Sequence, residues 1–209
     1  QNQVVNQVIN QGTSPGMSYT VDDFLTRQYY DMFGSPKRLN MTPTVTEQEF
    51  KRLMLAFAHT TSAVESGRPT SLTGIFSRQS NNTDNKSGRS TAQGYYQFTT
   101  ENGPTALNRL FQMGADQQYV KLLEQQYMTG GPDMKRLSKE DQTLVFFGNL
   151  FAQNGSDVAI NNFLTNPSDP DVMTHLYLGW HHSSPTVNDS LLFYNQGGKY
   201  SNYGLNSKG

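Results

Sequence analysis

The chain has 209 residues, of which 34% are hydrophobic, and its formal net charge is −1 at pH 7. That length predicts one domain with a sizeable core, and the near-neutral charge argues against general nucleic-acid binding, which requires a basic surface. The absence of cysteine excludes disulfides and Cys-based zinc sites. No apolar run approaches the roughly 18 residues that cross a bilayer, so no membrane span is expected.

The N-terminal segment, residues 1–18, is rich in Gln and Asn, which predicts a polar linker or tail. It lacks the charged and apolar regions of a signal peptide. An alternative is that a short apolar stripe in it docks on a partner: Val4, Val5, Val8 and Ile9. Because the chain begins with Gln1 rather than Met, we expect a processed product or a piece of a longer protein.

Two capping patterns mark the first two helices. Thr20 with Asp23 predicts a helix that ends at Gly34. After a loop with two prolines, Thr46 with Glu49 predicts the start of a second helix. Gly67 and Pro69 predict the end of that helix. Residues of this second helix recur at spacings of three and four, which indicates one buried face: Phe50, Leu53, Met54, Phe57, Thr61 and Val64.

Glu65 falls in the last turn of this second helix, at the edge of the apolar face. The negative end of the helix dipole disfavours an ionised Glu by roughly 0.3–1 kcal/mol, which is less than one pKa unit. Partial burial would raise the pKa further, toward the value that a general acid needs near neutral pH. A solvated Glu at a frayed helix end is the alternative interpretation.

Residues 71–98 show no strong periodicity, and residues 77–90 are predicted to form an exposed, mobile polar loop that contains Asp84. Helical patterns then dominate. Glycine, proline or a capping serine bounds most of the predicted helices, which we place near residues 104–113, 119–129, 138–154, 158–164, 170–180 and 187–194. The final segment, residues 196–209, is predicted to be a flexible tail.

Two motifs carry a resemblance to a known family. Glu65-Ser66 closes a core helix, and Gly94-Tyr95-Tyr96-Gln97 follows after the polar loop. This arrangement resembles lytic transglycosylases of the lysozyme-like superfamily, and the Tyr-Gln-Phe-Thr run is most similar to virion-associated enzymes of bacteriophages. The resemblance implies a mainly α, lysozyme-like α+β domain over residues 19–195. It would be a helical bundle around the central Glu-bearing helix, with a small β-hairpin near residues 71–98.

Two weaker similarities lie downstream. Residues 138–142, Ser-Lys-Glu-Asp-Gln, look like the segment that follows the active-site region in phage enzymes of this kind. Residues 175–181 resemble their late helix, in which a tyrosine, here Tyr177, faces the sugar cleft. The Ala-Tyr-Asn pattern of the family is absent from this segment.

The resemblance implies cleavage of the MurNAc–GlcNAc β-1,4 bond of peptidoglycan by Glu65 alone. As an acid it protonates the leaving oxygen, and as a base it activates the muramic C6 hydroxyl, which yields a 1,6-anhydro product. No cofactor is implied. The partners would be glycan strands and, through the termini, other virion proteins. The protein would act from a phage virion on the bacterial cell wall in the periplasm.

Substrate contacts are expected from residues beside the acid: Ser66, Gly94, Tyr95, Tyr96, Gln97 and Tyr177. Gly94 would let the backbone approach a sugar closely, and Gln97 supplies both a donor and an acceptor. Consecutive residues of an extended segment face opposite sides, so one of Tyr95 and Tyr96 should be buried and the other open to the cleft.

Several alternatives stay open. Asp84, or next Glu101, would be the second carboxylate of a hydrolytic muramidase. A protein of another class would be a lysozyme-fold structural component of a virion with an inactive site. The four histidines show no pattern of three or four converging zinc ligands, and no Gly-x-Ser-x-Gly elbow of a serine hydrolase is present.

Overall fold

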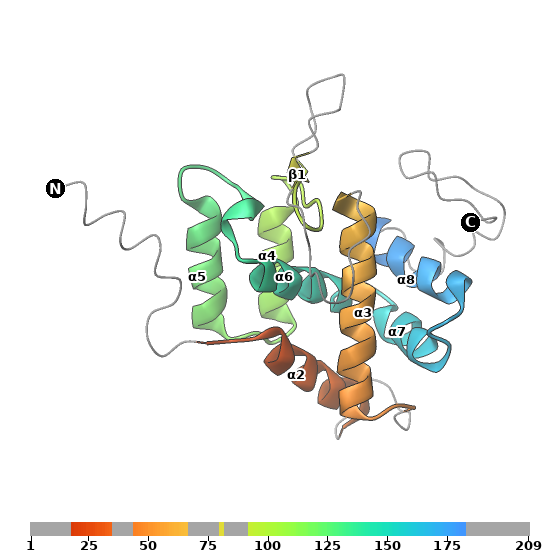
Figure 1. Cartoon of the computed structure of the whole chain (residues 1–209). Coiled ribbons are helices and arrows are strands. Elements are labelled where there is room, and N and C mark those ends of the chain that lie inside the picture. Colours follow the sequence, from red (N-terminus) through yellow and green to blue (C-terminus); the bar gives the residue numbers. More distant parts are fainter. Residues whose placement is uncertain (1–17, 35–43, 67–79, 82–91, 183–209) are drawn as a thin grey trace.

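The structure is a computed structural model, and it describes residues 18–34, 44–66, 80–81 and 92–182. This part of the chain is mostly helical, with one short two-stranded sheet (Figure 1). The helices are α2 (Val21–Phe33), α3 (Glu47–Ser66), α4 (Gly103–Gln112), α5 (Gln117–Met128), the 3₁₀ helix η1 (Met134–Arg136), α6 (Lys139–Phe151), α7 (Ser156–Thr165) and α8 (Pro170–His182). No helix in these ranges has the length and apolar character to cross a bilayer.

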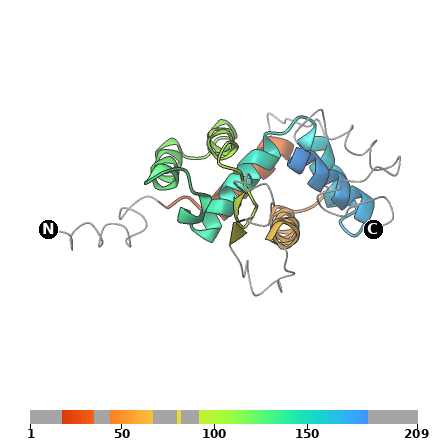
Figure 2. The same ribbon diagram turned by 90° about the horizontal axis from the view of Figure 1, so that it is seen from above.

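The helix at the centre of the molecule is α6. All of its residues from Asp141 to Phe151 are buried, and it packs against α2, α3, α4 and α7. Figure 2 shows α4 and α5 on one side of it and α3, α7 and α8 on the other. The crossing with α4 is close, because a Cβ at Gly148 would lie 2.5 Å from the Cα of Leu110.

The expectation of a bundle around the Glu-bearing helix was therefore wrong about which helix is central. Helix α3 has one buried face and one exposed face, whereas α6 is buried on nearly all sides, including its polar residues, and is surrounded by other helices. The expected face of α3 is buried except for Val64, which is 44% exposed. Two other apolar residues, Phe111 of α4 and Val158 of α7, are also exposed.

The predicted capping residues start the helices as expected. The Asp23 amide donates to Thr20 Oγ1 at 3.1 Å and the Thr20 amide donates to Asp23 Oδ2 at 2.9 Å, a complete capping box. At α3 the Glu49 amide donates to Thr46 Oγ1 at 3.2 Å. The boundaries of the first two helices were thus readable from local side-chain chemistry.

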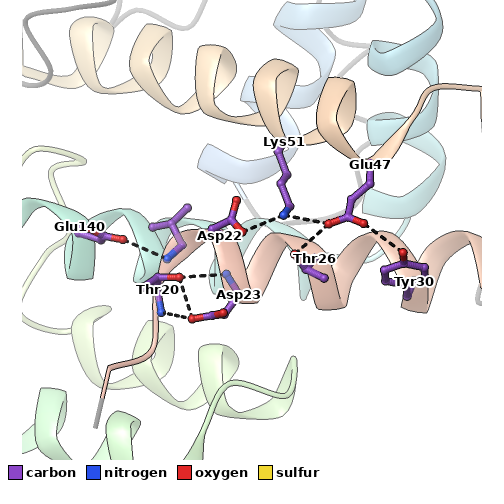
Figure 3. A network of polar contacts seen from close by, with 9 residues as sticks. Thr20, Asp22, Asp23, Thr26, Tyr30, Glu47, Lys51 and Glu140 are labelled. Carbon is purple, nitrogen blue, oxygen red and sulfur yellow. Dashed lines mark hydrogen bonds and ion pairs between the residues drawn. The ribbon is translucent and has the colours of Figure 1, made fainter. Parts of the chain in front are cut away.

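A polar network fixes α2 against the start of α3 (Figure 3). Lys51 Nζ lies 2.8 Å from Asp22 Oδ2 and 2.9 Å from Glu47 Oε1. Glu47 also accepts hydrogen bonds from the hydroxyls of Thr26 and Tyr30, each at 3.1 Å. These contacts orient α3, whose far end carries Glu65.

The small sheet lies where the sequence placed it. Strand β1 (Ser80–Asn81) pairs antiparallel with β2 (Gln93–Gly94), with Ser80 opposite Gly94 and Asn81 opposite Gln93. The predicted tails, the loop containing Asp84 and the predicted helix near 187–194 lie outside the described residues.

Candidate functional site

Glu65 lies in the last turn of α3 with its side chain only 4% exposed. The hydroxyl of Tyr177, on α8, donates a 2.7 Å hydrogen bond to Glu65 Oε1. Burial raises the pKa of the Glu65 carboxyl from 4.5 to about 7, and the hydrogen bond from Tyr177 opposes that rise. The interpretation as a solvated Glu at a frayed end is therefore wrong for this side chain.

The size of this shift identifies its cause. A rise from 4.5 to about 7 corresponds to about 3 kcal/mol. The dipole at a helix C-terminus contributes roughly 0.3–1 kcal/mol. Desolvation is thus the dominant effect, and it depends on α8 covering the end of α3.

The covering surface on α8 is aromatic. The rings of Tyr177 and Trp180 lie 6.1 Å apart, and the ring of Trp180 lies 6.2 Å from that of Phe98, immediately after the Gly94–Gln97 motif. Glu65 and Phe98 therefore contact neighbouring α8 side chains, Glu65 that of Tyr177 and Phe98 that of Trp180. Among the described residues, no hydrogen bond joins Glu65 directly to Gln97.

The motif itself forms a tight turn. Gly94 has φ of +77° and Gln97 has φ of +52°, a backbone conformation that non-glycine residues rarely adopt. The side-chain amide nitrogen of Gln97 donates to the Gly94 carbonyl at 2.7 Å, and the Gln93 amide donates to the Phe98 carbonyl at 2.8 Å. The donor group of Gln97, expected to meet the substrate, thus closes the turn in this structure.

Gln142, from the buried face of α6, clamps the turn. Its Oε1 accepts a hydrogen bond from the Tyr95 amide at 2.9 Å, and its Nε2 donates to the Leu137 carbonyl at 3.0 Å. A Cβ at Gly94 would lie 2.3 Å from this Oε1. The structure thus gives Gly94 a packing role, and a larger residue there would disturb the fold as well as any bound sugar.

The two tyrosines differ in burial, but residues 95–97 form a turn rather than the extended segment on which the alternation argument relied, and Tyr95 is packed against the edge of the core. Tyr96 is 1% exposed, stacks on Phe146 at 4.5 Å, and shares a 3.1 Å hydrogen bond with the Thr143 hydroxyl. This corrects the expectation of a substrate contact for the Tyr96 side chain, which belongs to the core. Tyr95 is half-buried and remains the candidate for sugar contact.

The remaining expected site residues lie elsewhere or outside the described part. Ser66 ends α3, but its side chain is not among those described, and neither is Asp84. Glu101 is exposed and its charge acts on Tyr127 of α5 rather than on Glu65. Over the described ranges, no three His, Asp or Glu side chains gather as a metal site requires.

Sequence reasoning missed two residues. Gln142 was part of a motif, but nothing local indicated that it reaches the turn. His181 lies with its Nε2 3.6 Å from Glu65 Oε1. It follows Tyr177 by four positions on α8, and residues so spaced share a helix face, so the expected role of Tyr177 could have identified it.

The chain matches no protein-family model, and comparison with curated proteins and with solved structures likewise gave no match.

Proposed function

We propose that this protein is a peptidoglycan lytic transglycosylase with a lysozyme-like fold, in which Glu65 is the single acid and base. The observation that carries the proposal is the buried Glu65 carboxyl, whose pKa lies near 7. A general acid works best when its pKa is close to the working pH, because a large fraction of it is then protonated and its proton is still transferred readily.

The first step is proton transfer to the glycosidic oxygen. Tyr177 donates to Oε1, so the acidic proton of Glu65 resides on Oε2. Glu65 Oε2 makes no hydrogen bond to any described residue and is the oxygen that faces the leaving group in this scheme. The bond between C1 and the leaving oxygen breaks, and Glu65 becomes a carboxylate that Tyr177 continues to stabilise.

In the second step the carboxylate takes the proton of the muramic C6 hydroxyl while O6 bonds to C1. The product is a 1,6-anhydro ring, and Glu65 is returned to its protonated form. No water is consumed. Burial of the carboxyl suits this route, because exclusion of water from the carboxyl favours the substrate's own C6 hydroxyl over bulk water as the nucleophile.

The hydrolytic alternative needs a second carboxylate that either forms a covalent intermediate or activates water. Among the described residues, the polar groups paired with the Glu65 carboxyl are the Tyr177 hydroxyl and the His181 imidazole, and neither is a carboxylate. This supports the route with a single Glu. Asp84, the expected second carboxylate, lies outside the described ranges.

The test is digestion of purified sacculi followed by mass spectrometry of the products. Anhydro-muropeptides support the proposal. Reducing muramic ends with no anhydro product would establish a hydrolase, and Asp84→Asn would then abolish the reaction. The absence of any product, from protein that is folded by circular dichroism, would refute enzymatic function and favour a structural role.

The similarity of residues 94–99 to phage enzymes supports a place in a virion, from which the protein would digest the wall locally in the periplasm. Other virion proteins would then bind its termini. Proteomic analysis of gradient-purified particles tests this part of the proposal, and a protein found only in the soluble lysate would contradict it.

A further inference from the structure

Glu65 has a second neighbour on α8 besides the tyrosine that binds it. His181 Nε2 lies 3.6 Å from Glu65 Oε1, the same oxygen that accepts the hydrogen bond from Tyr177. The two α8 side chains are four positions apart and therefore approach the carboxylate from one helix face. Both contacts leave Oε2 to the reaction.

The imidazole is held in place by its neighbours. Its ring lies 5.7 Å from that of Tyr177 and 5.7 Å from that of Trp180. The His181 side chain is 19% exposed and that of Glu65 only 4%. Two ionisable groups this close and this poorly solvated are weakly screened, so the charge of either one changes the proton affinity of the other.

We propose that His181 is a positioning residue that shares a proton with Glu65, so that the two groups titrate as a coupled pair. A neutral imidazole, with Nε2 3.6 Å from Oε1 and so beyond a hydrogen bond, leaves the carboxyl free to keep its proton. An imidazolium favours the carboxylate, which cannot deliver a proton. The consequence for catalysis rests on the proposed function, whereas the coupling itself does not.

The pH window follows from both groups. The Glu65 carboxyl has a pKa of about 7, and a histidine titrates near 6.5 when unperturbed. From α8 the titratable groups that face Glu65 are Tyr177 and His181, and among the described residues α3 itself adds none in contact. Tyrosine stays neutral in this range, so the pair consists of Glu65 and His181.

The direct test is a carbon NMR titration of the Glu65 carboxyl in protein labelled at glutamate, in the parent and in two variants. In the parent we expect two steps, with matching inflections in the His181 imidazole signals. In His181→Gln the amide keeps an N–H but cannot carry a charge, so one step should remain. In His181→Leu the donor is lost as well, and the single midpoint should rise by about 0.5 unit.

His59→Gln is the matched control, because His59 lies on α3 with Glu65 and is not in contact with its carboxylate. It should retain the two-step curve. A parent carboxyl that titrates in one step, at a midpoint that neither His181 variant moves, would overturn the inference. Should His181→Leu not fold, the comparison of His181→Gln with the parent decides the matter alone.

The same variants separate this inference from the proposed function. Coupled titration with no product from sacculi would refute the function and leave the coupling intact. Anhydro product with an activity profile against pH that is identical in the parent and His181→Gln would refute the role of His181 and leave the function intact.

Discussion

Replacing Glu65 by Gln should remove activity and at the same time stabilise the protein at alkaline pH. Gln keeps the size of Glu and an oxygen that can accept the hydrogen bond from Tyr177, but it cannot deliver a proton. Loss of a positioned acid costs about 10²- to 10⁴-fold in rate. The stability gain arises because, at alkaline pH, the folded parent must ionise a carboxyl that is almost fully buried.

The magnitude and sign follow from proton linkage. The pKa of Glu65 is about 7 in the folded protein and 4.5 when the group is solvated. Between these values the native state binds more protons than the unfolded state, so stability falls as pH rises. At about 1.4 kcal/mol per pKa unit, the parent loses about 3 kcal/mol between pH 4 and pH 8. Glu65→Gln has no carboxyl at this position, so its unfolding free energy should not decrease from this cause over the same pH range.

Urea unfolding of both proteins at pH 4 and at pH 8 measures the effect, with two-state behaviour checked by two probes. Their difference in unfolding free energy should change by about 3 kcal/mol in favour of the variant at the higher pH. Parallel pH dependence in the two proteins would show that Glu65 is not a destabilised buried acid, and the assignment of its role would fail with it.

Three further predictions concern Tyr177, Gly94 and Asp84. Tyr177→Phe removes a donor to the carboxylate, so the pKa of Glu65 and the alkaline limit of activity should rise by about one unit. Rates on sacculi between pH 5 and pH 9 measure this limit, and a limit that stays where it is in the parent, or moves down, would contradict the prediction. Gly94→Ala should cost about 1–3 kcal/mol in chemical denaturation, and less in a Gln142→Ala background, since the obstructing oxygen is then gone; equal costs in both would exclude the clash. Asp84→Asn should leave the rate of anhydro-product formation close to that of the parent, and a loss as large as that of Glu65→Gln would favour a hydrolase.

The features that sequence predicted well are those encoded by near neighbours. The capping box of Thr20 and Asp23 joins residues three apart, and the buried face of α3 repeats every three to four residues. Such signals need no knowledge of the rest of the chain. They also placed Glu65 correctly, in a final helical turn beside a core face.

The features that were missed depend on contacts between distant residues. The central helix is the one that other helices surround, here α6. Its sequence does not reveal this position, because polar residues such as Asp141 and Gln142 are buried together with its apolar ones. The clamp of Gln142 on the turn joins α6 to a segment 47 positions away. From the sequence alone, Gly94 could be explained as a turn residue or by the close approach of a sugar, but not by the packing of Gln142 against it.

The acid and its tyrosine are 112 positions apart in the chain. During synthesis Glu65 therefore leaves the ribosome long before α8 exists to cover it. A nascent chain that ends before residue 170 lacks Tyr177 and His181, the two α8 side chains that lie against the carboxyl. The surroundings of the carboxyl are thus completed only when α8, the last described helix, docks on the end of α3.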